Sequence, residues 1–191
     1  MRKVPAMKLS LGLAALVLLA APAMAQEAGT ATGQQIDPQA YVGLWHEVAS
    51  TPMPFQAMCT GGTTALYELV DDETLRVLNR CDTAEGSAEV EGTAEVVGGN
   101  LNTFNVQFPQ SPDDQGVNYV IVAVGEPAGG AYPWAAVHSP EGGYAWILSR
   151  TPELDAAERE AAEAALAGAG ADVSALKDTA QPPKNYDPAQ D

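Results

Sequence analysis

Basic residues are scarce in this chain, and histidine is rarer still. Its 191 residues include nine Lys and Arg against 25 Asp and Glu, which gives a formal net charge of −16. Nucleic acid and anionic membrane surfaces repel such a charge, and no run of basic residues offsets it. The two histidines, His46 and His138, stand on separate strand-like segments without a matching pattern of acids or thiols. We therefore expect no nucleic-acid partner, no metal and no cofactor.

Long hydrophobic runs are also missing. The apolar run at residues 9–21 has 13 residues, whereas a helix needs about 20 to span a bilayer. Arg2, Lys3 and Lys8 accompany this run and Ala23-Met24-Ala25 follows it, which is the pattern of a secretory signal peptide. Residues 1–25 are predicted to be removed after Ala25. No cysteine lies near the cut, so we expect a periplasmic or secreted protein without a stable membrane anchor.

Cysteine occurs only twice, at Cys59 and Cys81. The two residues flank a predicted hairpin in a chain that we expect to be exported, and export favours a disulfide. A closed loop of about 23 residues would stabilise the fold by roughly 3 kcal/mol. A metal site is less favoured because neither histidine is near in sequence. A redox pair is less favoured still, because the spacing is far from C-x-x-C.

Strand-like segments dominate the rest of the chain, and turn residues separate them. Because helices do not alternate with the strands, a parallel α/β sheet is excluded and a sandwich or a barrel is predicted. The eight segments are residues 42–50, 63–70, 75–81, 88–96, 101–108, 117–124, 132–138 and 144–149.

One helix is predicted near the end of the chain. Thr151 is expected as its N-cap, with Pro152 in the first turn, and the helix runs through Asp155 to Ala167. Its inner stripe is predicted to be Leu154, Ala157, Ala161 and Ala165. Residues 26–40 are expected to form a flexible lead, and residues 179–191 a loose tail.

Two sequence blocks carry a resemblance to a known family. The first is Tyr41–Ala49, which contains Gly43-Leu44-Trp45, and the second is Tyr144–Pro152, which ends in Ser-Arg-Thr-Pro with Arg150. Phe55-Gln56 with Cys59 and Asn118-Tyr119 support them. Over residues 41–178 the chain resembles the bacterial, outer-membrane lipocalin-like branch of the lipocalins. It departs from that branch in lacking the lipoprotein cysteine and in carrying His46 where relatives have tyrosine.

The resemblance implies an all-β fold, an eight-stranded antiparallel up-and-down β-barrel with one C-terminal α-helix packed on the outside. It also implies that Gly43, Trp45 and Arg150 are structural and meet at the closed end of the barrel. There the Arg150 guanidinium can stack on the Trp45 ring, a contact of about 0.5–2 kcal/mol. Eight strands leave room for packed side chains or for one small ligand.

Strand alternation predicts which side chains point inward, and the resemblance makes these the candidate ligand contacts. Trp146 and Tyr119 rank highest, because the family's cup is lined by aromatic residues on those strands. The full set is Tyr67, Phe104, Val106, Tyr119, Ile121, Trp134, Tyr144, Trp146 and Leu148. The predicted function is binding and transport or storage of a small hydrophobic ligand, such as a fatty acid or a lysophospholipid, by a monomer or weak dimer.

Two alternatives stay open at this point. A lipocalin-scaffold enzyme acting on an isoprenoid or oxidised lipid would need an inward acid or histidine, with Glu47 or His138 as the first candidates. No nucleophile–base pair is recognisable, so no catalytic residue is predicted. The other alternative is a barrel filled by its own side chains that serves as a protein-interaction module.

Overall fold

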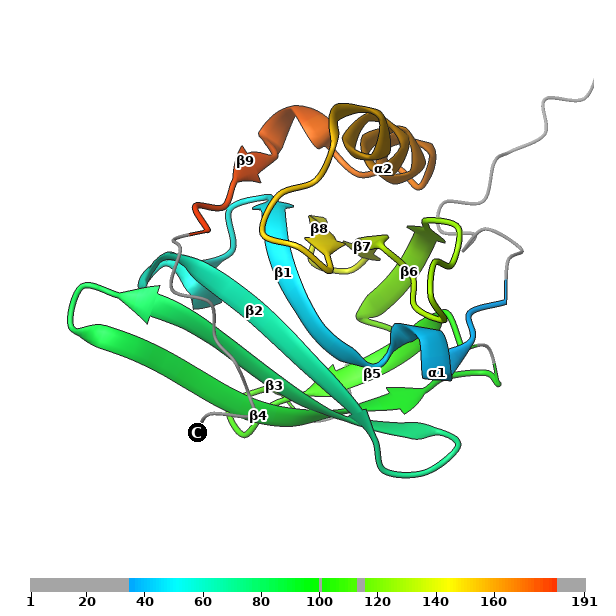
Figure 1. The fold of residues 1–191 in the computed structure, drawn as a ribbon. Helices are drawn as coiled ribbons and strands as arrows, with labels where there is room; N and C mark the ends of the chain where they lie inside the picture. The colour runs from blue at the N-terminus through cyan, green and yellow to red at the C-terminus, as the bar shows by residue number, and fades with distance from the viewer. Residues whose placement is uncertain (1–34, 100, 113–115, 182–191) are drawn as a thin grey trace, which may run out of the picture.

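The computed structural model describes residues 35–99, 101–112 and 116–181, so the predicted signal peptide lies outside the described residues. Nine strands form one antiparallel sheet in the order β2-β3-β4-β5-β6-β7-β8-β1-β9, and β1 also pairs with β2 (Figure 1). That last pairing closes eight strands into a barrel. The strands are β1 (Gly43–Ser50), β2 (Cys59–Leu69), β3 (Thr74–Thr83), β4 (Gly86–Val96), β5 (Thr103–Gln107), β6 (Tyr119–Val124), β7 (Trp134–Ser139), β8 (Tyr144–Ser149) and β9 (Lys177–Asp178).

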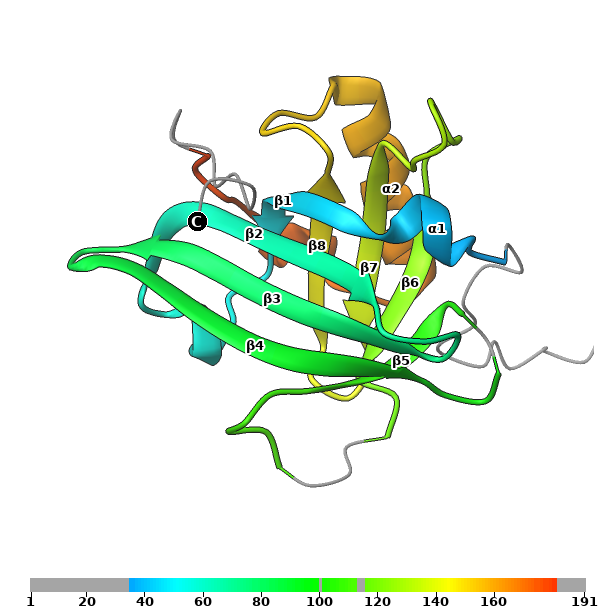
Figure 2. The ribbon, with the colours of Figure 1, turned by 60° about the horizontal axis from the view of Figure 1, so that its bottom comes forward.

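Four helical segments accompany the sheet in the described part of the chain, and only α2 is longer than four residues. They are α1 (Pro38–Tyr41), the 3-10 turn η1 (Pro54–Gln56), α2 (Ala156–Gly168) and the 3-10 turn η2 (Val173–Ala175). The long strands β2, β3 and β4 extend past the rest of the barrel, and β1–β4 cross β6–β8 at a steep angle (Figure 2). Among the described residues, no helix is both apolar enough and long enough to pass through a bilayer.

Alternation explains why these segments form half-buried strands. On β3, Leu75 and Val77 are buried inside the barrel, whereas Arg76 between them pairs with Glu68 and Glu91 on the outer surface. Side chains of a strand point alternately to its two faces, so a period of two separates an apolar interior from a charged exterior. This period, visible in the sequence, is the signal that predicted the strands.

A glycine allows β4 to approach β5 closely. A Cβ atom at Gly92 would lie 2.2 Å from the backbone oxygen of Gln107 and within 3 Å of the Phe108 ring. Glycine inside a strand typically marks such a bend or close approach. Gly92 therefore permits the sheet to turn between its two halves and close.

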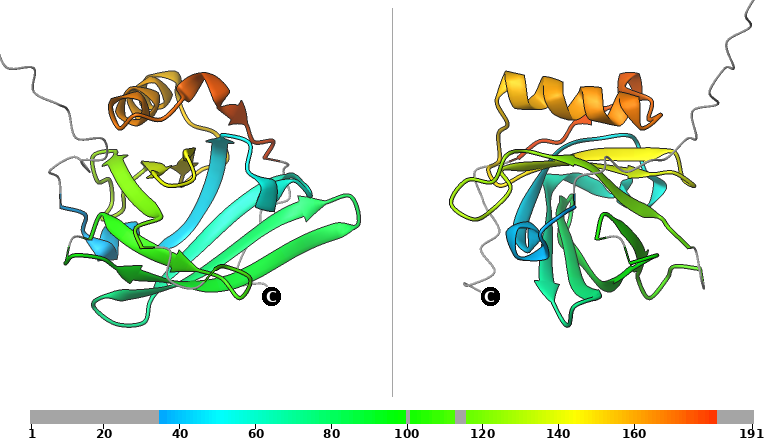
Figure 3. Two further views of the ribbon diagram at one scale, coloured as in Figure 1. Left: turned by 180° about the vertical axis from the view of Figure 1, so that it is seen from behind. Right: turned by 90° about the vertical axis from the view of Figure 1, so that its right-hand side faces the viewer.

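Helix α2 lies outside the barrel against β6 and β7, as the right-hand view of Figure 3 shows. Ala162 and Leu166 are its buried residues. They pack in a second apolar cluster with Val122, Ala136 and Ile147 from the outer face of the sheet. The external helix agrees with the fold that the sequence predicted.

The predicted beginning of this helix was wrong. Asp155, not Thr151, is the N-cap, and its carboxylate accepts hydrogen bonds from the backbone N–H groups of Ala157 and Glu158. Threonine and aspartate both favour the N-cap position, and here the Asp155 side chain is the one that reaches the free N–H groups of the first turn. The predicted inner stripe was half right, because Leu154 and Ala165 pack against the outer cluster whereas Ala157 and Ala161 are exposed.

The two ends of the domain are better ordered than predicted. Ile36 and Ala40, within the predicted flexible lead, are buried in the barrel core. These residues therefore belong to the barrel domain. Thr179 and Gln181, within the predicted loose tail, make hydrogen bonds to β1 and β2. Residues 26–34 and 182–191 lie outside the described part of the chain.

Residues 177–181, here called the C-terminal strap, complete the barrel wall. β1 pairs with β2 only from Gly43 to His46, and beyond that point its free side is occupied by β9. The Gln181 side-chain amide donates to the backbone oxygens of Glu47 and Thr63, which belong to the two separated strands. The C-terminal strap thus fills the opening between β1 and β2 where they no longer pair, beyond His46 and Thr64.

Candidate ligand-binding site

One end of the barrel is closed around Trp45 and Arg150. The Trp45 side chain is 0% exposed, and the guanidinium carbon of Arg150 lies 3.6 Å from the centre of its ring. The guanidinium donates to the carbonyl oxygens of Leu44, Ala40, Tyr41, Val42 and Tyr132 at 2.8–3.2 Å. Burial lowers the pKa of Arg150 to about 10. Its charge is compensated by these five dipoles and by the indole face.

Gly43 sits against this arginine. Its φ is +103°, and a Cβ atom there would lie 3.3 Å from an Arg150 nitrogen. A positive φ of this kind favours glycine over other residues. The structure therefore brings Gly43, Trp45 and Arg150 together at the closed end.

Three tyrosines form a connected group above the closed end. The Tyr119 hydroxyl lies 2.6 Å from the Tyr41 hydroxyl and 3.0 Å from the Tyr67 hydroxyl. Burial raises the pKa of Tyr41 and Tyr119 well above the ordinary value, and that of Tyr67 to about 12. All three therefore stay protonated near neutral pH and give the barrel interior a neutral, polar floor.

A cavity of about 610 Å³ opens above this floor. Tyr67, Tyr119 and Leu148 line its bottom, and Trp146 stands in its wall with its ring 5.5 Å from that of Tyr119. The rim carries Phe55 and Met58, which are 62% and 60% exposed. The volume lies in the range of pockets that hold a small ligand, about 300–1,000 Å³. A barrel filled by its own side chains would not leave this space.

Six of the nine predicted contact residues line this cavity, and three do not. Phe104 and Ile121 point inward as predicted, but they are buried below the floor. Trp134 does not point inward. The six lining residues are Tyr67, Val106, Tyr119, Tyr144, Trp146 and Leu148.

The inward orientation predicted for Trp134 was wrong because the alternation shifts by one residue at Pro133. Tyr132 belongs to the barrel core, whereas Trp134 packs in the outer cluster beneath α2. A one-residue slip moves every following side chain to the other face. Ala135 and Val137 are therefore the inward residues of β7. The proline inside the predicted strand was the available signal.

Two polar residues line the cavity that were not among the predicted ligand contacts, although Glu47 was a candidate for the enzymatic alternative. Glu47 on β1 is 5% exposed, and its carboxylate accepts hydrogen bonds from Ser50, Gln56 and Thr179. Asn79 on β3 has a buried Oδ1 without a hydrogen-bond partner in the described structure. Both follow the inward period of their strands, which would have found them if polar residues had been included in the search.

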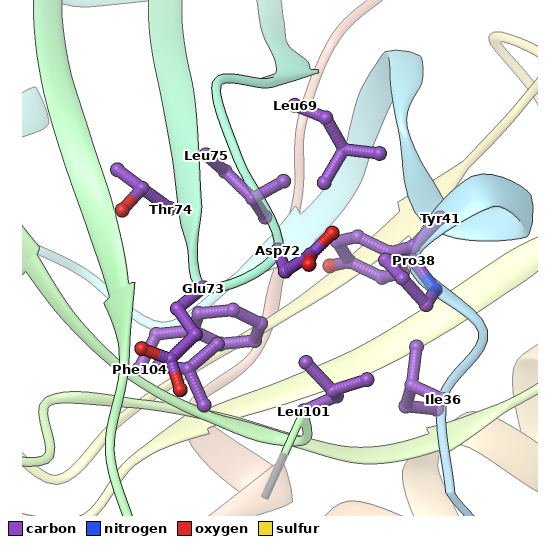
Figure 4. Close-up of a pocket in the computed structure, with 11 residues that line it drawn as sticks. Ile36, Pro38, Tyr41, Leu69, Asp72, Glu73, Thr74, Leu75, Leu101 and Phe104 are labelled. Carbon is purple, nitrogen blue, oxygen red and sulfur yellow. The ribbon is translucent and has the colours of Figure 1, made fainter. Parts of the chain in front are cut away.

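A second, much smaller cavity lies near the closed end (Figure 4). It encloses about 10 Å³, enough for about one water molecule. Tyr41, Leu75 and Phe104 form its inner side, and Asp72 and Glu73 its outer side. It is too small for an organic ligand, so the large cavity is the candidate site.

The predicted disulfide is confirmed. Cys59 and Cys81 are joined, with their Cα atoms 5.6 Å apart, and both line the cavity. The bond connects the beginning of β2 to the end of β3 beside the rim. It therefore restrains the part of the wall that lies farthest from the closed end.

The histidines do not face the cavity. His46 and His138 are buried on the other side of their strands, and burial lowers the pKa of each. Within the ranges that the structure describes, no group of three His, Cys, Asp or Glu side chains is placed to hold a metal ion. Of the two candidates for an enzymatic role, only Glu47 lines the cavity.

A closed eight-stranded barrel with an external helix and an open apolar cup defines a class of small-ligand binding protein. Comparison with known proteins gives the family. The lipocalin-like domain matches residues 36–181, most of the chain, and the chain belongs to the lipocalin family. It is a lipocalin of the bacterial type. Membership supports binding of a small hydrophobic ligand, since lipocalins are mainly binding proteins.

Individual relatives agree with this assignment. Temperature-induced lipocalin-1 of Arabidopsis thaliana is 29% identical over 164 residues, covering 79% of this chain and 84% of its own. The outer membrane lipoprotein Blc of Vibrio cholerae is 33% identical over 118 residues, covering 60% and 65%. Among solved structures, apocrustacyanin C1 shares the fold with a TM-score of 0.64 at 16% identity, covering 83% of this chain and 90% of that one.

Proposed function

We propose that this protein binds a lipid with a single acyl chain, of the fatty-acid or lysophospholipid type, in the cup and carries or stores it. The observation that carries the proposal is the hollow of about 610 Å³ between the tyrosine floor and the apolar rim. Aromatic residues such as Trp146 and Tyr144 suit a cup that is apolar inside and wet at its mouth.

The energetics of such binding are reasonable. Burying about 14 methylene groups at about 0.8 kcal/mol each contributes about 11 kcal/mol. Lost translational freedom and ordering remove several kcal/mol of that. The remainder corresponds to a dissociation constant near one micromolar, which suits a carrier that must also release its ligand.

We further propose that the protein works in the periplasm or outside the cell. A disulfide forms and persists in an oxidising compartment, and the structure contains the Cys59–Cys81 bond. The relatives named outer membrane lipoprotein agree with a location in the cell envelope. The predicted signal peptide, residues 1–25, would bring the chain there.

Tryptophan fluorescence tests the proposal, because the three tryptophans occupy three different environments. Trp146 lines the cup, Trp134 lies beneath α2, and Trp45 lies at the closed end. Titration with a lysophospholipid or a fatty acid is expected to change the emission saturably. Trp146→Phe should remove most of that change, whereas the matched variant Trp134→Phe should retain it.

Two results would contradict the proposal. One is an emission that does not respond to any of several chain lengths and head groups. The other is a response that survives Trp146→Phe and disappears in Trp134→Phe, since this would place the ligand outside the barrel.

A further inference from the structure

The charged side chains around the cup are mainly acidic. Glu47, Glu89 and Glu141 line the cavity, and Arg80 is the one cationic residue among the described lining residues. Arg80 pairs with Glu89 at 3.8 Å on the neighbouring strand. The chain as a whole carries a formal charge of −16, which adds to a negative potential at the mouth. An anionic head group entering this cup is therefore opposed by both near and distant charges.

Glu47 is the buried acid of this set. Its Oε1 accepts hydrogen bonds from Ser50 Oγ at 2.9 Å and Thr179 Oγ1 at 2.7 Å, and its Oε2 accepts one from Gln56 Nε2 at 3.0 Å. All three donors are neutral, and no described cation lies within ion-pair distance of Glu47. A carboxylate can accept about four hydrogen bonds, so one position remains. Burying a carboxylate without a cation is costly.

Asn79 adds a second acceptor to the same interior. Its Oδ1 is buried, lines the cavity and accepts no hydrogen bond from the described residues. Most buried polar atoms in proteins have a partner, and an orphan in a binding cavity is a position for a ligand donor. Glu47 and Asn79 therefore both require hydrogen-bond donors.

Aromatic rings at the mouth provide a third favourable element. Phe55 and Tyr144 pack edge to face with ring centres 5.8 Å apart, and Trp146 lines the wall on the same strand as Tyr144. Faces of such rings attract ammonium groups, including quaternary ones. The polar and aromatic surfaces of the cup thus favour the same ligand chemistry.

We infer that the cup selects single-chain lipids whose polar end carries an ammonium group, held by Glu47, over the same chain ending in a carboxylate. The inference rests on the proposed function. Of the two ligand types proposed above, it favours a lysophospholipid whose head ends in a primary amine over a free fatty acid.

Three ligands of equal chain length test this inference on the unmodified protein. Dodecylamine, dodecanol and dodecanoate are titrated at neutral pH, where the amine is charged because alkyl ammonium groups have a pKa near 10. Dodecylamine is expected to bind about tenfold or more tightly than dodecanoate, with dodecanol between them. An affinity for dodecanoate equal to or above that for dodecylamine would overturn the inference, whereas failure of all three to bind would overturn the proposed function itself.

A pair of charge variants assigns the preference to one residue. Glu47→Gln is expected to weaken dodecylamine binding about tenfold and dodecanol binding much less. Glu95→Gln removes the same charge from an exposed site on the outer face of β4 and should change neither. An equal loss of dodecylamine and dodecanol binding in Glu47→Gln would mean that Glu47 only holds the wall together, and would refute its role in selection.

Discussion

At the scale of single residues, Arg150 shows how one side chain can seal the end of a barrel. Its planar fork serves five carbonyl oxygens while its face rests on Trp45. Four of those carbonyls belong to residues 40–44, at the end of α1 and the start of β1, and the fifth belongs to Tyr132, which precedes β7. A guanidinium satisfies many acceptors at once and is less strongly hydrated than an ammonium, so arginine suits a half-buried position better than lysine.

Replacing Arg150 by lysine is therefore expected to destabilise the fold. The ammonium has three donors instead of five and no planar face, so some carbonyls and the Trp45 ring lose their partner. We expect the free energy of unfolding to fall by about 2–3 kcal/mol in a urea titration. Arg159→Lys is the control, because Arg159 forms surface ion pairs and its change should cost under about 1 kcal/mol. Equal effects of the two variants would contradict the sealing role.

The buried tyrosines make a prediction about alkaline pH. The pKa values of Tyr41, Tyr67 and Tyr119 are raised in the folded protein, so their protons are held more tightly there than in the unfolded chain. Their contribution to stability is complete below the unfolded pKa of about 10 and is lost as the pH rises above it, for Tyr67 by about pH 12. The free energy of unfolding should therefore decline steeply above about pH 10.

Spectrophotometric titration of tyrosinate, combined with urea melts at several alkaline pH values, tests this decline. Three of the six tyrosines should ionise late, together with unfolding. If all six ionise near the ordinary pKa while the fold persists, the three hydrogen-bonded hydroxyls of Tyr41, Tyr67 and Tyr119 are not buried as described. Tyr119→Phe, which removes the shared hydroxyl, should weaken the pH dependence.

At the scale of elements, the sequence predicted the strands well and their faces less well. Each of the eight barrel strands coincides with one predicted segment, because the period of two persists along it. β2, β3, β4 and β7 extend beyond the predicted bounds, and β2 begins four residues earlier than predicted. The phase of a strand is less secure, and Pro133 shifted it on β7 so that Trp134 packs outside. The start of α2 was misplaced because Thr151-Pro152 and Asp155 both carry capping signals, and only tertiary packing decides between them.

The candidate site was predicted in its aromatic part and missed in its polar part. Tyr67, Tyr119 and Trp146 were predicted because strand alternation places them inside and the lipocalin resemblance makes inward aromatic residues ligand contacts. Glu47 and Asn79 follow the same period, but a buried acid is rare, and Glu47 was considered only for an enzymatic role. Its hydrogen bonds come from η1 and the C-terminal strap, which no local pattern connects to β1.

The disulfide gives a prediction about the β2–β3 pair. Cys59 and Cys81 are 22 positions apart, and their bond restrains the unfolded chain. The double variant Cys59→Ser, Cys81→Ser is expected to lower the free energy of unfolding by about 3 kcal/mol. Urea melts of the variant, compared with the unmodified protein with and without a reducing agent, measure the effect. A loss much below about 1 kcal/mol would show that strand pairing alone holds this part of the wall.

At the scale of the whole molecule, the barrel depends on contacts between distant parts of the chain. β1 pairs with β8 along one edge, and along its other edge it pairs first with β2 and then with the C-terminal strap. The apolar core therefore closes only when both ends of the domain meet, and α2 then covers the outer cluster on β6 and β7. Contacts of this range cannot be inferred from local patterns, which explains why residues 179–181 of the strap were predicted to belong to a loose tail.

The C-terminal strap also determines at which stage of synthesis the barrel wall is complete. A chain is synthesised from its N-terminus, so β1 and β2 are made well before residues 177–181, which fill the opening between them. Until residues 177–181 have been made, the barrel wall stays open between β1 and β2. We therefore expect stable ligand binding only after residues 177–181 have been made and have closed this part of the wall.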